Sequence, residues 1–177
     1  MSEPTRSPQG LKLAYFPFGL AIIPLGLVLL AAKVAATSCQ ISQSIYRDAD
    51  GKGFELIFGR AIPGTASSDA TATISHSQQT QVYYFDVGQS SGYGTISLAD
   101  LSPQNGTLAD NSPLNLFFFD QASQSVTPLF LEETTEAPEY AFVSGLGSYD
   151  YYARRGMITE DTPPLLGDMM WVYDRCQ

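Results

Sequence analysis

The side chains that could carry out catalysis are few in this chain of 177 residues. His76 is the only histidine, so any nucleophile that needs an imidazole base would have to use it. His76 stands in the segment 74–78, at the end of a predicted strand. We therefore interpret His76 as a surface or strand-edge residue, and we expect a protein that is not an enzyme and needs no cofactor.

Metal ligands are also sparse. Asp48 and Asp50 begin a stretch that resembles the start of a calcium loop, with oxygen donors at alternate positions. Lys52 then stands where a third oxygen ligand belongs, and the twelfth position is Gly59 instead of a glutamate. An Asp-Gly turn is the favoured interpretation, and no metal site is predicted.

The two cysteines, Cys39 and Cys176, lie near the two ends of the chain's polar part. Outside the cytoplasm the default expectation for such a pair is a disulfide. A redox site is the alternative, but the chain has no CxxC sequence and the two residues are far apart. We therefore predict one disulfide that ties a stalk directly above a membrane to the last strand of the domain.

Clustered aromatic residues supply a candidate binding surface. In the run 117–119 three phenylalanines follow one another, so a strand there must place at least one ring on its outer face. Tyr149, Tyr151 and Tyr152 likewise put rings on both faces. Exposed aromatic side chains mark protein or sugar contacts, although they can also pack beneath a loop. Phe117, Phe119 and Tyr151 are the residues we expect at such a surface.

Residues 13–32 form an uncharged stretch between Lys12 and Lys33. As a helix it would be about 30 Å long, the thickness of the hydrocarbon core of a bilayer. The favoured interpretation is a retained transmembrane helix. Arg6 and Lys12 precede the segment and only Lys33 follows it closely, which favours a cytoplasmic N-terminus.

Two other interpretations of this stretch remain open. It could be a cleaved signal peptide, although its apolar core is longer than usual. It could also precede a lipidated Cys39, since residues 36–39 loosely resemble a lipobox. Gly19 and Gly26 are seven residues apart, about two helical turns, and so lie on nearly one helix face. Small residues on one face let transmembrane helices pack closely, so we expect other membrane subunits to contact this face.

The polar part of the chain is strongly acidic. From residue 37 onward six arginines and lysines stand against seventeen aspartates and glutamates, a net charge near −11. Nucleic acid requires a basic surface, so it is not an expected partner. A cationic protein outside the cytoplasm fits this charge better.

After residue 44 the pattern is one of short strands separated by turn residues. No stretch beyond residue 32 shows an apolar period of 3.6 residues. An antiparallel β-sandwich or jelly roll on a single transmembrane helix is the predicted fold. The domains follow: a cytoplasmic tail at 1–12, the helix at 13–32, a stalk at 33–44 and the β-domain at 45–177. Roughly nine strands are expected, at 54–58, 70–75, 81–87, 94–98, 114–119, 126–131, 140–143, 149–153 and 169–173.

Between residues 80 and 156 lie three strand-like segments, 83–87, 94–101 and 114–120, and a tyrosine-rich segment, 147–156. Together they resemble the bacterial pre-peptidase C-terminal type of β-sandwich domain. The chain departs from that family at Asn115 and in its long acidic segment 132–139. The resemblance implies a sandwich fold and a secreted accessory or binding role.

Together these features predict a non-catalytic, single-pass membrane protein whose acidic domain lies outside the cytoplasm. We expect it to serve as an accessory or scaffolding subunit of a membrane complex. The alternative is a secreted or anchored module that binds polysaccharide or another extracellular ligand.

Overall fold

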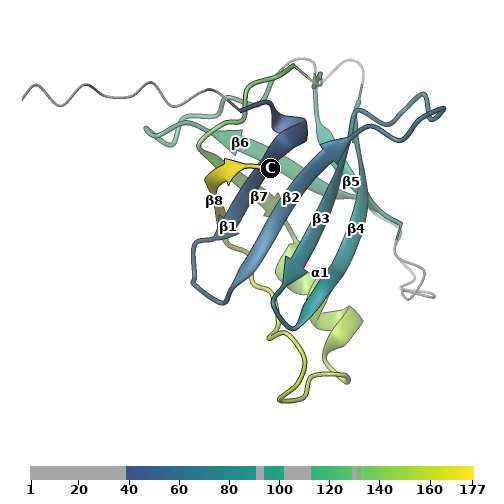
Figure 1. The fold of residues 1–177 in the computed structure, drawn as a ribbon, viewed down its shortest axis with the longest axis vertical. Coiled ribbons are helices and arrows are strands. Elements are labelled where there is room, and N and C mark those ends of the chain that lie inside the picture. The colour runs from purple at the N-terminus through teal and green to yellow at the C-terminus, as the bar shows by residue number, and fades with distance from the viewer. Residues whose placement is uncertain (1–38, 91–93, 102–112, 129–130, 133) are drawn as a thin grey trace, which may run out of the picture. The chain divides into compact units, whose positions relative to one another are not determined.

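The computed structural model describes residues 39–90, 94–101, 113–128, 131–132 and 134–177. All of them belong to the second of the chain's two units, Ala36–Gln177. Eight antiparallel strands follow one another around a closed barrel in chain order, so that the last strand pairs with the first (Figure 1). They are β1 (Ser44–Asp48), β2 (Phe54–Arg60), β3 (Ala70–His76), β4 (Gln79–Gln89), β5 (Ile96–Asp100), β6 (Leu114–Phe119), β7 (Tyr140–Ser144) and β8 (Met170–Cys176).

Alternate residues of the strands point into the barrel and fill it. In β2, for example, Phe54, Leu56 and Phe58 are fully buried, whereas Glu55 and Ile57 are partly exposed. This two-residue alternation is the side-chain period of a strand, and an eight-stranded barrel is just wide enough to be filled by side chains. The largest fully buried side chains are those of Trp171, Tyr46, Tyr83, Phe54, Phe58, Phe85 and Phe118.

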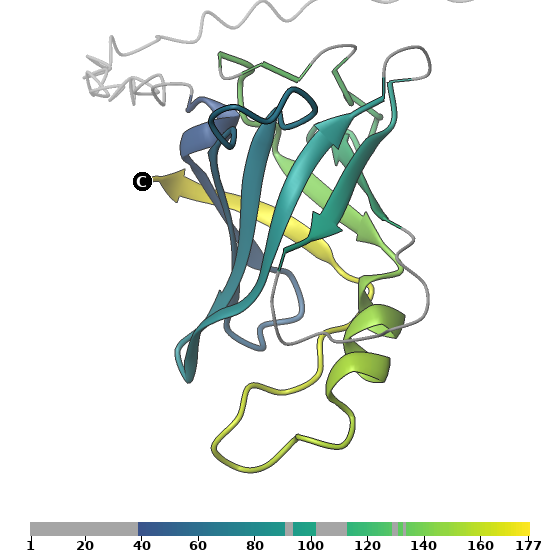
Figure 2. The same cartoon turned by 90° about the vertical axis from the view of Figure 1, so that its right-hand side faces the viewer.

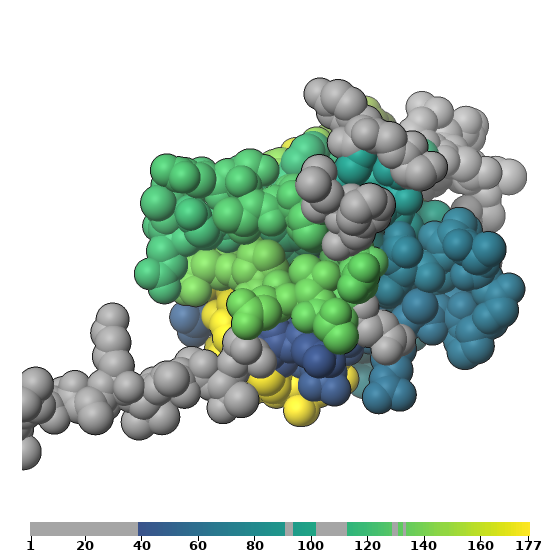
Figure 3. Space-filling view, turned by 90° about the horizontal axis from the view of Figure 1, so that it is seen from above, coloured from purple at the N-terminus to yellow at the C-terminus, as the bar shows by residue number. Residues whose placement is uncertain are grey.

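One end of the barrel is covered by a short 3-10 helix, η1 (Ile41–Gln43), and by the acidic segment before β7. The amide of Ile41 donates to the carbonyl of Thr135 at 2.7 Å, and the amide of Ala137 donates to the carbonyl of Cys39 at 2.7 Å. Figure 3 looks onto this end and shows the segment before β7 in light green beside the first described residues in dark blue. The acidic segment is therefore hydrogen-bonded to the start of the domain.

The opposite end is covered by helix α1 (Leu146–Arg154) and the loop that leads from it to β8 (Figure 2). Gly145 precedes the helix in the left-handed conformation, at a φ of 81°, which glycine adopts without steric cost. Leu146, Asp150 and Arg154 lie four residues apart and are the buried face of the helix.

The predicted β-sandwich on an N-terminal transmembrane helix is wrong. A sandwich needs two separate sheets that face each other, whereas here β8 pairs with both β7 and β1, so a single sheet closes on itself. Among the residues that the structure describes, no helix has both the length and the apolarity to cross a membrane. Residues 13–32, where we expected such a helix, lie outside the described part of the chain.

The strand predictions are mostly confirmed. Two segments were misassigned: 149–153 belongs to α1, and 126–131 contains no strand in its described part. Strand β1 was not predicted, and residues 39–44, which we had placed in the stalk, contribute the buried side chains of Cys39 and Ile41. The confirmed segments overlap strands β2 to β8 and are 54–58, 70–75, 81–87, 94–98, 114–119, 140–143 and 169–173.

Candidate binding surface

His76, the one imidazole, connects two hairpins at the end of β3. Its Nδ1 accepts a hydrogen bond from the amide of Gln78 at 3.1 Å, so Nε2 carries the proton and donates to the carbonyl of Lys52 at 3.1 Å. The ring lies 4.9 Å from that of Phe54, between ring centres. Both ring nitrogens are therefore engaged with the backbone, and this arrangement explains the residue as a structural one.

The stretch that begins at Asp48 forms the turn between β1 and β2. The Asp48 carboxylate accepts hydrogen bonds from the amides of Lys52 and Gly53, the latter at 3.1 Å and 3.2 Å. Gly51 and Gly53 have φ angles of 71° and 92°, in the left-handed region that favours glycine. The Asp48 carboxylate thus stabilises an Asp-Gly turn. The residues described in the structure include no cluster of three or more His, Cys, Asp or Glu suited to a metal.

The predicted disulfide is confirmed. Cys39 and Cys176 are bonded, with their Cα atoms 5.8 Å apart and 137 positions between them in sequence. The bond joins the residue ahead of η1 to the final strand, at the end of the barrel opposite α1.

Beneath α1 lies a cluster of polar side chains that the sequence did not reveal. We call Tyr83, Asp150 and Arg154 the buried polar cluster. The Asp150 carboxylate is fully buried and accepts from the Tyr83 hydroxyl at 2.7 Å, from Arg154 Nη2 at 2.8 Å and from the amide of Leu166 at 2.7 Å. A charge this deep is tolerated because its oxygens are paired.

The arginine of the cluster is paired as completely as the aspartate. Its Nη1 and Nη2 donate to the carbonyls of Pro163 and Pro164 at 3.1 Å and 2.8 Å, so Arg154 also fixes the loop that returns to β8. Burial would lower the pKa of Arg154, but hydrogen bonds and charge from Asp150 more than offset it and raise the pKa. Burial, and then Asp150, raise the pKa of the Tyr83 hydroxyl. The cluster therefore ties β4, α1 and the loop before β8 together.

The outer face of β6, β7 and β8 carries apolar side chains at outward-facing positions, whereas the buried polar cluster places charged side chains inside. Phe117 pairs in register with Phe142, which pairs with Met170. Two residues further along each strand, Phe119 pairs with Tyr140, which pairs with Val172. Phe117 is exposed and the other five are partly exposed, and they form the surface that we call the apolar wall: Phe117, Phe119, Tyr140, Phe142, Met170 and Val172.

The opposite side of the barrel has a different character. Outward-facing positions of β3, β4 and β5 include Thr73, Asp86 and Ser97. Such polar residues are what an outer barrel face in water normally carries. The six neighbouring apolar residues of the apolar wall are therefore a local departure, and contiguous exposed apolar surface on a small domain is typical of a contact site.

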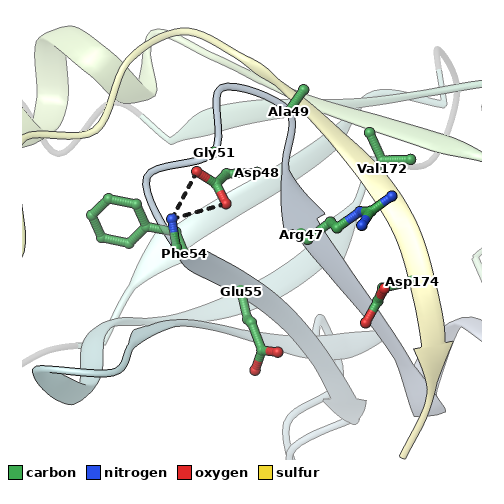
Figure 4. A pocket seen from close by; sticks show the side chains of 9 residues that line it. Arg47, Asp48, Ala49, Gly51, Phe54, Glu55, Val172 and Asp174 are labelled. Carbon is green, nitrogen blue, oxygen red and sulfur yellow. Dashed lines mark hydrogen bonds between the residues drawn. The ribbon is translucent and has the colours of Figure 1, made fainter.

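A pocket of about 560 Å³ adjoins the apolar wall and shares Val172 with it (Figure 4). Figure 4 shows Arg47 reaching from β1 toward Val172 and Asp174 on β8, with Glu55 on β2 below. The dashed bonds in the figure are those between Asp48 and the backbone of the turn. The lining residues are Arg47, Asp48, Ala49, Gly51, Gly53, Phe54, Glu55, Val172 and Asp174.

The residues predicted for a binding surface separate into two places. Phe117, at 38% exposure, and Phe119 belong to the apolar wall. Tyr151 lies elsewhere, on the outer face of α1, where the Arg155 guanidinium is 5.4 Å from the ring centres of both Tyr151 and Tyr152. Phe142 was missed, although it lies in a predicted strand whose residues are apolar on both faces; that pattern was the available signal.

Gly19 and Gly26, the predicted helix-packing residues, lie outside the described part of the chain. No protein-family description, curated protein or solved structure matches this chain. The resemblance to pre-peptidase C-terminal domains therefore remains a prediction. In the segment 147–156, which the resemblance assigns to a strand, residues 147–154 belong to α1.

Proposed function

We propose that this protein is a non-catalytic accessory or scaffolding subunit whose barrel docks a partner protein on the apolar wall. The observation that carries the proposal is the register of β6, β7 and β8, which places Phe117, Phe142 and Met170 side by side on the outer face. Aromatic residues and methionine are enriched at protein interfaces. Because the interior is filled by large side chains, the outer surface is the natural place for a contact.

The partner we propose has an apolar contact face bordered by basic residues. Asp120 follows Phe119, and Glu139 precedes Tyr140, so carboxylates flank one end of the apolar wall. The acidic balance of the whole domain acts in the same sense, because complementary charge speeds encounter and excludes wrong partners.

We place this function outside the cytoplasm. The disulfide between Cys39 and Cys176 supports this location, since such bonds persist in oxidising compartments and are rare in the cytosol. The uncharged stretch at 13–32 supports export of the residues that follow it.

Site-specific photocrosslinking in the cells that make the protein tests the proposal. A photoreactive phenylalanine analogue at Phe142 should give a discrete covalent adduct, whereas the same analogue at Thr73, on the opposite side of the barrel, should not. Equal adducts at the two positions, or none at either, would refute docking on the apolar wall. An adduct of twice the chain mass would identify a second copy in place of a different protein.

A polysaccharide-binding module is the second candidate, favoured by the exposure of Tyr151 and Tyr152, 46% and 61%. Their rings are inclined by 79° and share the Arg155 guanidinium, so they offer no flat stacking platform, which places this candidate second. A glycan array with the wild type and Tyr152→Ala distinguishes the two: sugar binding lost in the variant would favour the module.

A further inference from the structure

The pocket beside the apolar wall contains the guanidinium of Arg47, an exposed side chain. Arg47 points outward from β1, directly opposite Val172 on β8 and Glu55 on β2. It makes no ion pair with any residue that the structure describes. Among the described residues, two carboxylates near it, those of Glu55 and Asp174, are paired with another arginine instead.

That arginine is Arg175, which binds both of the neighbouring carboxylates. Arg175 Nη2 lies 2.8 Å from Glu55 Oε1, and Nη1 pairs with Asp174. The register of β1 and β8 shifts between Ile45 and Tyr46, leaving Asp174 as the extra residue of a bulge. Bulges re-aim side chains. Here the bulge lets consecutive residues 174 and 175 reach the same side, so that no described carboxylate pairs with Arg47.

We propose that this pocket binds a carboxylate that adjoins an apolar side chain, on a peptide segment of the docked partner. The planar guanidinium of Arg47 matches a carboxylate in a two-bond, fork-like contact. Val172 belongs to both the pocket and the apolar wall, so an apolar side chain next to the carboxylate would lie on the wall. The remaining pocket anion, Asp48, is already bound to the turn amides. This inference rests on the proposed function, because the same surface receives the partner.

Titration of the full-length protein, followed by nuclear magnetic resonance, tests the site with N-acetyl-leucine as the probe. The side-chain Nε–H signal of Arg47 and the methyl signals of Val172 should shift together and saturate. Additions up to about 50 mM are needed, because one charge-assisted contact with a small apolar group binds in the millimolar range. The Nε–H signal of Arg155, an exposed arginine on the far end of α1, serves as the internal reference.

Three comparisons make the test decisive. N-acetyl-leucinamide, which lacks the carboxylate, should bind at least about tenfold more weakly, and Arg47→Gln should weaken binding of the acid by a similar factor. The matched variant Arg155→Gln should leave the titration unchanged. Equal binding of acid and amide, an unaffected Arg47→Gln variant, or no saturable shift in the wild type would each overturn the proposal.

Acetate distinguishes a site that binds both a carboxylate and an apolar side chain from a site that binds the carboxylate alone. It should bind more weakly than N-acetyl-leucine and leave the Val172 methyl signals in place; equal shifts would overturn the apolar half of the site. If N-acetyl-leucine fails while the crosslink at position 142 persists, the carboxylate site is refuted and the docking surface stands. If the crosslink fails while Arg47-dependent binding saturates, the docking surface is refuted and the carboxylate site stands.

Discussion

The buried polar cluster and the apolar wall reverse the usual distribution of residues in opposite ways. The cluster places an aspartate and an arginine inside, under α1, whereas the wall places phenylalanines outside, on β6 and β7. In the cluster every carboxylate and guanidinium group has partners within the domain. The side chains of the wall, by contrast, all keep part of their surface exposed in the part of the chain that the structure describes.

This difference separates stability from recognition. A buried charge is kept only when its hydrogen bonds are satisfied, so a complete network indicates a role in folding. An exposed apolar group lowers the free energy only when something else covers it, so an uncovered patch indicates a contact with another molecule. Four variants test this difference, and the one with the greatest predicted loss of stability comes first.

Removal of the disulfide gives a reference value for the loss of stability, because the two cysteines belong neither to the buried polar cluster nor to the apolar wall. Cys39→Ser with Cys176→Ser releases a loop of 137 residues, and the chain-entropy model gives a loss of about 4–5 kcal/mol in unfolding free energy. Urea denaturation with and without a reductant measures the loss. Reduced wild type should match the double variant, and an unchanged midpoint would contradict the expectation.

Replacement of Asp150 by alanine should destabilise the fold by about 3–5 kcal/mol, since it leaves the buried Arg154 without its charge partner. The amide of Leu166 and the hydroxyl of Tyr83 also lose their acceptor. Urea denaturation measures this effect too. Asp168→Ala is the control and should cost far less, because Asp168 is exposed and accepts from the amide of Gly147.

Tyr83→Phe should cost about 1–2 kcal/mol near neutral pH and should change the response to alkali. The pKa of Tyr83 is raised above its ordinary value of 10.0, so the folded state holds a proton that the unfolded chain releases above that pH. Stability that is present below pH 10 is therefore lost as pH rises above it. Denaturation midpoints between pH 8 and 11 should fall less steeply in the variant than in the wild type.

Part of the alkaline loss should remain in Tyr83→Phe, because burial raises the pKa of Tyr46 as well, and its hydroxyl donates to the carbonyl of Pro138 at 2.8 Å. Identical slopes in wild type and variant would contradict the role given to Tyr83.

Phe117→Thr should change the unfolding free energy by no more than about 1 kcal/mol, since threonine also favours a strand and the ring is partly exposed. It should nevertheless weaken the crosslink at position 142 and the binding of an apolar fluorescent dye. Thr73→Ser, on the polar side, is the matched control for both measurements. A large loss of stability would show that Phe117 serves the fold and not a partner.

Local sequence patterns predicted most strands but not their closure. The alternation in β2 or β4 is the same whether a sheet packs on a second sheet or curls onto itself. Closure depends on the pairing of β1 with β8, two segments more than 120 positions apart in sequence. β1 itself was missed because it is short and runs directly into the Asp-Gly turn.

The helix was missed for a related reason. Its inward positions 146, 150 and 154 have helical spacing, but two of them carry an aspartate and an arginine, so no apolar period is visible. Only the tertiary structure shows that these two charges neutralise each other at the barrel's end.

Neighbouring residues in the chain were enough to predict most strand segments and the turn after Asp48, and the presence of just two cysteines was enough to predict the disulfide. The sequence also indicated that Phe117 and Phe119 could face outward, because alternation along one strand is local. The tertiary structure decided that Phe142 and Met170 lie beside them and that Arg175 takes the anions next to Arg47. Cross-strand neighbours follow from register and closure, and these are set by contacts between segments that are distant in sequence.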